Sequence, residues 1–175
     1  MNITLPIIKD YPKPGVNFLD INPLLANPAD FKAVISRLCA HIGQLPTEVR
    51  AQAAIITPEA RGFIFAAPVA YELGLPLILI RKEGKIPHHP YPFHIKNEYT
   101  EYNMEVDGDL LARYTSFIYI DDILATGQTL GSVRQALRHK GKDLALSLHV
   151  TAVEALQKMR EDNPQLTDLP VRVLI

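Results

Sequence analysis

Short, almost wholly apolar runs alternate with helix-like patterns along this chain, and this alternation constrains its fold most strongly. Such runs indicate strands buried on both faces, which is typical of parallel sheets whose strands are joined by helices. We therefore predict an α/β fold with a mostly parallel open sheet covered by helices on both faces. The expected strands are residues 53–57, 77–80, 104–106, 117–120, 144–153 and 171–174.

The helical segments begin and end at residues with known preferences. Asn27 and Pro28 are typical of the N-cap and first position of a helix, and Gly43 can end that helix. Pro68 lies inside the second segment, where it must kink the helix or mark its start. The expected helices are residues 28–43, 62–73, 130–140 and 154–161.

A polar stretch over residues 82–98 interrupts this pattern and contains three prolines, so we predict a long loop there. Long loops in compact domains often serve as functional lids. His88, His89 and His94 lie in the same stretch, but no carboxylate or cysteine completes a recognisable zinc-binding spacing. We therefore expect these histidines to be solvated.

Bulk properties exclude several classes of protein. The 175 residues are most simply a single domain over residues 1–175, and one cysteine, Cys39, allows no internal disulfide or cysteine-based zinc site. A net charge of −1 argues against general nucleic-acid binding. The longest apolar stretch, residues 63–70, is too short to cross a membrane, and no signal peptide is visible. We expect a cytoplasmic protein that binds neither nucleic acid nor membrane.

The segment richest in chemistry is residues 118–129, where an apolar strand ends in Asp121 and Asp122 and a small-residue loop leads into a helix. Unpaired backbone N–H groups and the helix dipole at such a helix start favour a bound phosphate. Adjacent carboxylates suit sugar hydroxyls or a hydrated Mg²⁺. The segment therefore predicts a site for a phosphorylated ribose, the alternative being an ordinary strand–turn–helix with aspartates at the turn.

Two further strand ends carry polar residues, and ligands of parallel sheets bind at the carboxyl ends of strands. Residues 58–62 follow the first expected strand, and Arg81 and Lys82 follow the next one. Arginine holds phosphate oxygens through two parallel hydrogen bonds, whereas lysine supplies a compact charge. Solvated surface charge is the competing interpretation for the two lysines of this basic cluster. The cluster comprises Arg61, Arg81, Lys82 and Lys85.

These segments together resemble a known family. Residues 121–129, acid–acid–x–x–x–Thr–Gly–x–Thr, resemble the phosphoribosyl pyrophosphate motif of type I phosphoribosyltransferases. Residues 59–63 resemble the pyrophosphate-binding loop of adenine phosphoribosyltransferases, residues 81–87 the start of their mobile catalytic loop, and residues 11–21 their small N-terminal base-binding hood. The matches follow the family order up to about residue 129, and similarity is weak after about residue 150.

The resemblance implies roles for particular residues. Those implied to act in catalysis are Glu98, Arg61 and Lys82. Those implied to bind the ribose and, through water, Mg²⁺ are Asp121 and Asp122. Those implied for the 5′-phosphate are Ala125, Thr126, Gly127, Gln128 and Thr129. Those implied for the pyrophosphate are Glu59, Ala60, Arg61, Arg81, Lys82 and Lys85. Those implied for the base are Asn17, Phe18 and Leu19, although an isolated phenylalanine would more often belong to a core.

Some residues depart from the family pattern. Gln128 stands where the adenine enzymes usually carry a second glycine. Asn17 and Leu19 stand where an apolar and a basic residue, respectively, are common. Glu98 belongs to a Glu-Tyr pair that recurs at residues 101–102, and a solvated loop carboxylate is the competing interpretation for it. The departures concern the base more than the sugar phosphate.

The resemblance implies an enzyme that converts adenine and phosphoribosyl pyrophosphate to adenosine monophosphate (AMP) and pyrophosphate, with Mg²⁺ as cofactor and a homodimer as the usual assembly. Two alternatives stay open. The acceptor could be another purine, such as hypoxanthine, guanine or xanthine. The chain could also be a non-catalytic regulator that binds phosphoribosyl pyrophosphate, but such regulators usually carry an added DNA-binding region, for which this chain has no room.

Overall fold

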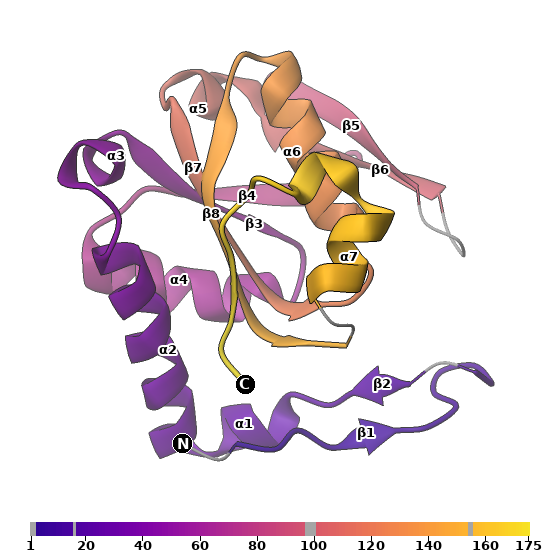
Figure 1. Ribbon diagram of the computed structural model, residues 1–175. Helices are drawn as coiled ribbons and strands as arrows, with labels where there is room; N and C mark the ends of the chain where they lie inside the picture. Colours follow the sequence, from indigo (N-terminus) through magenta and orange to yellow (C-terminus); the bar gives the residue numbers. More distant parts are fainter. Residues whose placement is uncertain (1–2, 16, 97–100, 154–155) are drawn as a thin grey trace.

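The computed structural model describes residues 3–15, 17–96, 101–153 and 156–175, and a seven-stranded sheet lies at its centre (Figure 1). The strand order is β5-β6-β4-β3-β7-β8-β9. Strands β4, β3, β7, β8 and β9 are parallel, whereas β6 runs antiparallel to β4 and β5 antiparallel to β6. The predicted mostly parallel sheet is therefore confirmed. The strand bounds are β3 Ala53–Pro58, β4 Leu77–Lys82, β5 Pro90–Lys96, β6 Glu101–Asp107, β7 Ser116–Leu124, β8 Asp143–Ala152 and β9 Val171–Val173.

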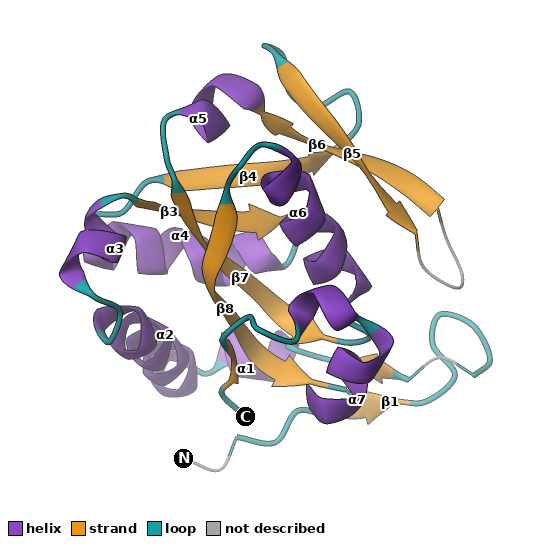
Figure 2. Ribbon diagram, turned by 45° about the horizontal axis from the view of Figure 1, so that its top comes forward, coloured by secondary structure: helices purple, strands orange, loops and turns teal. Residues whose placement is uncertain are grey.

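Helices cover both faces of this sheet, and Figure 2 shows it between α2 and α4 on one side and α6 and α7 on the other. Strand β7 alternates between the two cores. Ile118 and Ile120 belong to the core under α2 and α4, whereas Phe117 and Tyr119 belong to the core under α6 and α7. The helix bounds are α1 Asn22–Ala26, α2 Pro28–Gly43, α3 Thr47–Ala51, α4 Gly62–Leu73, α5 Gly108–Ala112, α6 Gln128–His139, α7 Leu156–Asp162 and the 3₁₀ turn η1 Pro164–Leu166.

The elements expected from the sequence are present, with ends that differ by a few residues. Helix α4 continues through Pro68 instead of starting there, because its apolar side chains are packed into the core beneath it. The sequence patterns missed α1, α3 and α5, each of which has five residues and too few turns for a hydrophobic period. They also missed a short N-terminal hairpin of β1 (Ile7–Ile8) and β2 (Phe18–Leu19).

The prediction of a long loop over residues 82–98 was wrong for residues 90–96, which form β5, whereas residues 83–89 contain no helix or strand. Pro90 and Pro92 lie in β5, an edge strand that pairs only with β6 among the described residues, so their missing N–H groups break no ladder on the open side. The turn before β5 is also held to β6, since the Glu105 carboxylate accepts hydrogen bonds from the N–H groups of Lys85 and Ile86, each 2.6 Å long. Pro90 and Pro92 thus indicate an edge strand of the sheet and not a loop.

No helix in the described ranges combines the length and the apolar character that a membrane span requires.

Candidate active site

The carboxyl ends of β3, β4 and β7 lie at one edge of the sheet, where α4 and α6 also begin. A cleft of about 230 Å³ opens there. In Figure 1 the β1–β2 hairpin lies below the ends of β7 and β8. The three strand ends thus meet at one edge of the sheet, as predicted, although none of the described residues of β4 lines the cleft. The cleft is lined by Pro58, Glu59, Ala60, Arg61, Tyr102, Met104, Asp121, Asp122, Ile123, Ala125 and Thr129.

The acid pair lies near the end of β7, and each carboxylate has a different partner. The Tyr119 hydroxyl donates to Asp121 Oδ2 over 3.0 Å, and Arg61 Nε lies 2.8 Å from Asp122 Oδ2. Burial raises the pKa of the Asp121 carboxyl well above its ordinary range, and the neighbouring Asp122 charge raises it further. Asp121 is therefore a poorly solvated carboxylate, and a hydroxyl donor or a cation bound to it would stabilise its charged form.

Gly62 sets how closely α4 approaches this pair. A Cβ at this position would lie 2.5 Å from Thr57 Oγ1 and 3.0 Å from Asp121 Oδ1, both closer than real Cβ atoms normally come. The close approach is therefore to β3 and β7. Gly62 thus allows the start of α4, and Arg61 before it, to lie against the acid pair.

The loop between β7 and α6 has the geometry of an anion cradle. Gly127 has a φ of +79° and turns the chain into α6, whose start no side chain caps among the described residues. By contrast, Asn27 caps α2 through its side-chain oxygen. The first N–H groups of α6 are therefore available to a ligand. A second hollow, of about 70 Å³, is lined by this loop together with Tyr119 and His149.

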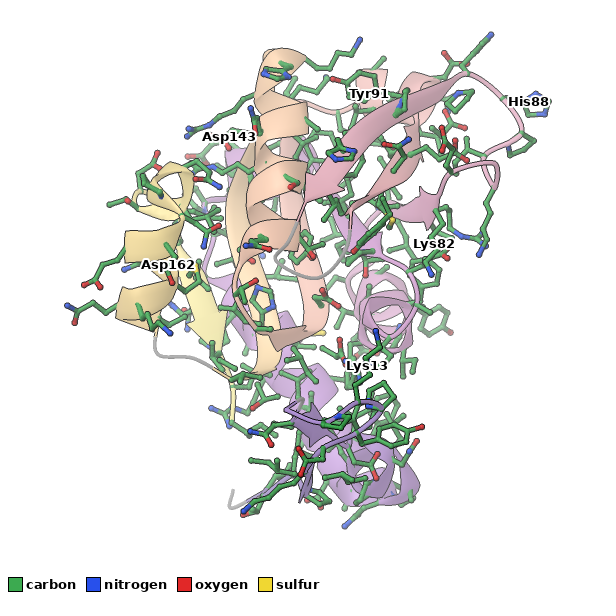
Figure 3. The ribbon with its side chains drawn as sticks, turned by 90° about the vertical axis from the view of Figure 1, so that its right-hand side faces the viewer. Lys13, Lys82, His88, Tyr91, Asp143 and Asp162 are labelled. Atoms are coloured by element: carbon green, nitrogen blue, oxygen red, sulfur yellow. The ribbon has the colours of Figure 1, made fainter. Side chains whose placement is uncertain are left out.

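The basic cluster is organised by a carboxylate. Glu59 Oε2 lies 2.7 Å from Arg81 Nε and Glu59 Oε1 lies 2.8 Å from Lys85 Nζ. In Figure 3, Lys82 lies at the end of β4 and His88 lies farther out in the turn that follows. Arg81 and Lys85 are thus brought together with Glu59, while Arg61 joins the acid pair instead. Glu59 holds two cations, whereas a direct contact from this carboxylate to pyrophosphate would be repulsive.

These contacts predict an acid-sensitive stability. Burial opposes ionisation of Glu59, but the hydrogen bonds from Lys85 and Arg81 outweigh it and lower its pKa from 4.5 to about 2. Because the folded-state pKa is depressed, the stabilisation is complete above pH 4.5 and is lost as the pH falls toward about 2. We expect Glu59→Gln to reduce the loss of stability between pH 5 and about pH 2.5, measured by urea unfolding. An unchanged loss, or an equal effect of the surface variant Glu48→Gln, would contradict this.

The N-terminal hairpin reaches the cleft through an aromatic contact. The Arg61 guanidinium lies 5.5 Å from the centre of the Phe18 ring, and Tyr11 packs edge-on against that ring at 5.3 Å. Leu19 is half-buried and pairs with Ile7 across the hairpin, while Asn17 is exposed. Phe18, in the segment expected to bind the base, thus contacts Arg61, which is expected to bind pyrophosphate.

Glu98 lies outside the described residues, so its expected catalytic role has no structural counterpart here. Tyr102, from the second Glu-Tyr pair, lines the cleft. Among the loop histidines, His89 Nδ1 lies 2.6 Å from Asp109 Oδ2, and this hydrogen bond raises the pKa of His89. The described residues contain no group of three or more His, Cys, Asp or Glu side chains that could hold a metal.

Sequence reasoning missed three buried polar residues around the site. The Tyr119 hydroxyl donates a hydrogen bond to Asp121. The two residues are two positions apart in β7 and therefore share a face, which was a usable signal in the sequence. His149 lies on β8 opposite Asp121, and burial lowers its pKa to about 3, so the ring is neutral at neutral pH. Asn163 hydrogen-bonds the loop between β7 and α6 from a distant segment. For the last two, nothing local in the sequence indicated the contact.

Comparison with known proteins gives consistent similarities. The family model described as "Phosphoribosyl transferase domain" matches residues 22–165. The chain is 39% identical over 155 residues to an adenine phosphoribosyltransferase of Roseiflexus sp. (strain RS-1), covering 87% of each chain. It is 38% identical over 168 residues to an adenine phosphoribosyltransferase of Treponema denticola, covering 96% of this chain and 84% of that one.

Solved structures give the same result. The crystal structure of adenine phosphoribosyltransferase from Thermoanaerobacter pseudethanolicus matches with a TM-score of 0.82 at 29% identity, covering 98% of this chain and 94% of that one. The enzyme from Giardia lamblia, solved with 9-deazaadenine, matches with a TM-score of 0.81 at 26% identity, covering 97% and 92%. The fold is therefore that of a recognised enzyme class.

Proposed function

Because this chain belongs to the adenine phosphoribosyltransferase family, we propose that it transfers the 5-phosphoribosyl group from phosphoribosyl pyrophosphate to adenine, giving AMP and pyrophosphate. The observation that carries this proposal is the placement of three parts at one edge of the sheet. The acid pair and the uncapped start of α6 line the cleft. Of the basic cluster, Arg61 lines the cleft, and Arg81 and Lys85 are paired with Glu59, which also lines it. These three parts suit the ribose hydroxyls, the pyrophosphate and the 5′-phosphate of one substrate.

The cleft supports a mechanism in which charge moves onto the leaving group. As the bond to pyrophosphate breaks, the anomeric carbon develops oxocarbenium character. Arg81 and Lys85, held by Glu59, stabilise the growing negative charge on pyrophosphate. Asp121 and Asp122 fix the ribose through its hydroxyls. Tyr102 and Met104 of β6 form a wall of the cleft that limits the entry of competing water.

The donor set of the acid pair fits Mg²⁺ as an expected cofactor. Mg²⁺ keeps several waters and uses one or two carboxylates together with substrate phosphates, and the cleft offers two adjacent carboxylates. Asp122 Oδ2 is buried and, although Arg61 lies close, it accepts no well-aligned hydrogen bond from the described residues. Asp121 and Asp122 would hold the ion, directly or through water, and it would neutralise charge on the pyrophosphate.

Pyrophosphate release measured with each purine base and phosphoribosyl pyrophosphate tests this function. We expect release with adenine and only when Mg²⁺ is present. Release with hypoxanthine, guanine or xanthine alone would favour the other purine enzymes. Binding of phosphoribosyl pyrophosphate without turnover of any base would favour a regulator.

Arg61 gives a more specific prediction. We expect Arg61→Ala to weaken binding of phosphoribosyl pyrophosphate by about tenfold more than binding of AMP, because the product lacks the pyrophosphate group. Titration calorimetry with both ligands measures the difference. Arg113→Ala, at an exposed position after α5, is the matched control and should change neither affinity. Equal weakening of both ligands would assign Arg61 to the ribose or to the fold.

Three broader expectations belong to the same proposal. Residues 1–175 act as one phosphoribosyltransferase domain, the protein works in the cytoplasm, and it assembles as a homodimer, as is usual in the family. Light scattering after size-exclusion chromatography tests the assembly, since a dimer would give about twice the chain mass of 19.5 kDa.

A further inference from the structure

The segment after β8 packs against the phosphate loop, which we define as residues 125–129. Helix α7 lies beside α6 (Figure 1), and Asp162 at its end is labelled in Figure 3. Asn163 follows directly, and only 4% of it is exposed. Neither Asn163 nor Met159 lines the cleft or the second hollow, so their contacts with the loop lie outside both.

The Asn163 amide binds two backbone carbonyls. Its Nδ2 donates to the carbonyl oxygen of Thr126 over 2.7 Å and to that of Met159 over 2.8 Å. One hydrogen bond thus reaches the phosphate loop and the other stays within the segment. A primary amide has two donor hydrogens, so both are used. Loss of the first bond would leave the Thr126 carbonyl without this partner.

The surroundings of Gly127 show how closely the phosphate loop packs against Met159 and Asn163. A Cβ on Gly127 would lie 2.7 Å from Met159 Cγ and 3.3 Å from Asn163 Nδ2. The positive φ of Gly127 already favours glycine, and the contact adds a second, independent requirement. The loop therefore takes its shape both from its own backbone and from the surface on which it rests.

That surface is itself fixed. Arg134 of α6 is 3% exposed and donates to Asp143 over 2.7 Å, to Asp168 over 2.6 Å and to the carbonyl oxygen of Gln165 over 2.6 Å. These bonds join α6 to the start of β8, to Gln165 in η1 and to Asp168 just after it. The segment that carries Asn163 is therefore fixed by contacts outside the phosphate loop, so Asn163 can hold the loop in place.

We propose that Asn163 is a positioning residue that holds the phosphate loop in its anion-binding conformation through the Thr126 carbonyl. The proposal rests on the proposed function, since it takes the loop to bind the 5′-phosphate. Asn163 does not touch substrate. It reduces the ordering that the loop would otherwise undergo on binding, so that the N–H groups at the start of α6 already point at the phosphate.

Titration calorimetry on the full chain with ribose 5-phosphate, and separately with pyrophosphate, tests this. We expect Asn163→Ala to weaken ribose 5-phosphate binding by at least about tenfold and to leave pyrophosphate binding unchanged. In turnover, KM for phosphoribosyl pyrophosphate should rise by a similar factor while kcat changes less than about threefold. Thr167→Ala is the matched control, because the exposed Thr167 hydroxyl donates to the Pro164 carbonyl of η1 and not to the phosphate loop.

Asn163→Ser separates positioning from folding. A serine at the end of a helix can still donate to the carbonyl four residues before it, here that of Met159, but is too short for Thr126. We expect a folded protein that binds ribose 5-phosphate as weakly as Asn163→Ala does. Wild-type affinity in Asn163→Ser, or equal loss of ribose 5-phosphate and pyrophosphate binding, would overturn the proposal. An absence of adenine turnover in the wild type would instead contradict the proposed function, while these binding measurements would still decide the role of Asn163.

Discussion

Replacing both Asp121 and Asp122 by asparagine is expected to lower kcat by about a thousandfold or more while leaving the protein folded. The two carboxylates line the cleft, and we propose that they bind the ribose hydroxyls and Mg²⁺. A loss of this size corresponds to about 4 kcal/mol of transition-state stabilisation. Steady-state pyrophosphate release at saturating substrates measures it.

Stability should change little in this variant, and the pKa of Asp121 gives the reason. Burial and Asp122 raise that pKa, so the stability Asp121 contributes under acidic conditions is lost as the pH rises through the raised value. Asparagine removes this unfavourable charge, which offsets the lost ion pair between Asp122 and the partly exposed Arg61. We expect a Tm within about 5 °C of the wild type. Asp109→Asn, an exposed carboxylate, is the control. Near-normal turnover in the folded double variant would contradict a role for the pair.

The fold was largely predictable because the local sequence pattern indicates most of the helices and strands. A run such as residues 53–57 is too apolar to be anything but a covered strand, and Asn27 caps its helix as its type predicts. The error over residues 82–98 has a physical cause. Edge strands tolerate proline, and the Glu105 contacts that order the turn come from about twenty residues away in the chain. A local sequence pattern shows neither that a strand lies at the edge of a sheet nor which distant residue contacts a turn.

The site was predictable as a location and less so as a set of contacts. Parallel topology alone brings Arg61, Arg81 and Asp121 to one edge of the sheet. It cannot tell which cation each carboxylate binds, and Glu59 proved to hold Arg81 and Lys85. The role of Asn163 could not be predicted from the sequence, because its contact with the loop depends on how the segment after β8 packs. The roles of these residues in binding substrate stay predictions that the variants above decide.

We propose that the base preference depends on the backbone of the N-terminal hairpin. Strand β2 pairs with β1 on one side among the described residues, which leaves backbone groups along its other edge. In a strand, the N–H and C=O of one residue point to the same edge. Such a pair matches adenine, which presents an amino donor beside a ring-nitrogen acceptor. Hypoxanthine and guanine present a carbonyl beside an N–H, so both contacts would become repulsive.

We therefore expect kcat/KM for adenine to exceed that for hypoxanthine by at least about 100-fold, or about 2.7 kcal/mol, because a site built to hydrogen-bond one pattern rejects its inverse strongly. Initial rates with each base at saturating phosphoribosyl pyrophosphate measure the ratio. Asn17→Ala is the informative companion, since the Asn17 amide is exposed and could offer either a donor or an acceptor. If the backbone sets the preference, Asn17→Ala keeps the ratio, whereas its collapse would assign the preference to that side chain. Comparable rates with 6-oxopurines in the wild type would overturn the adenine assignment and leave the phosphoribosyltransferase fold and its sugar-phosphate site as they stand.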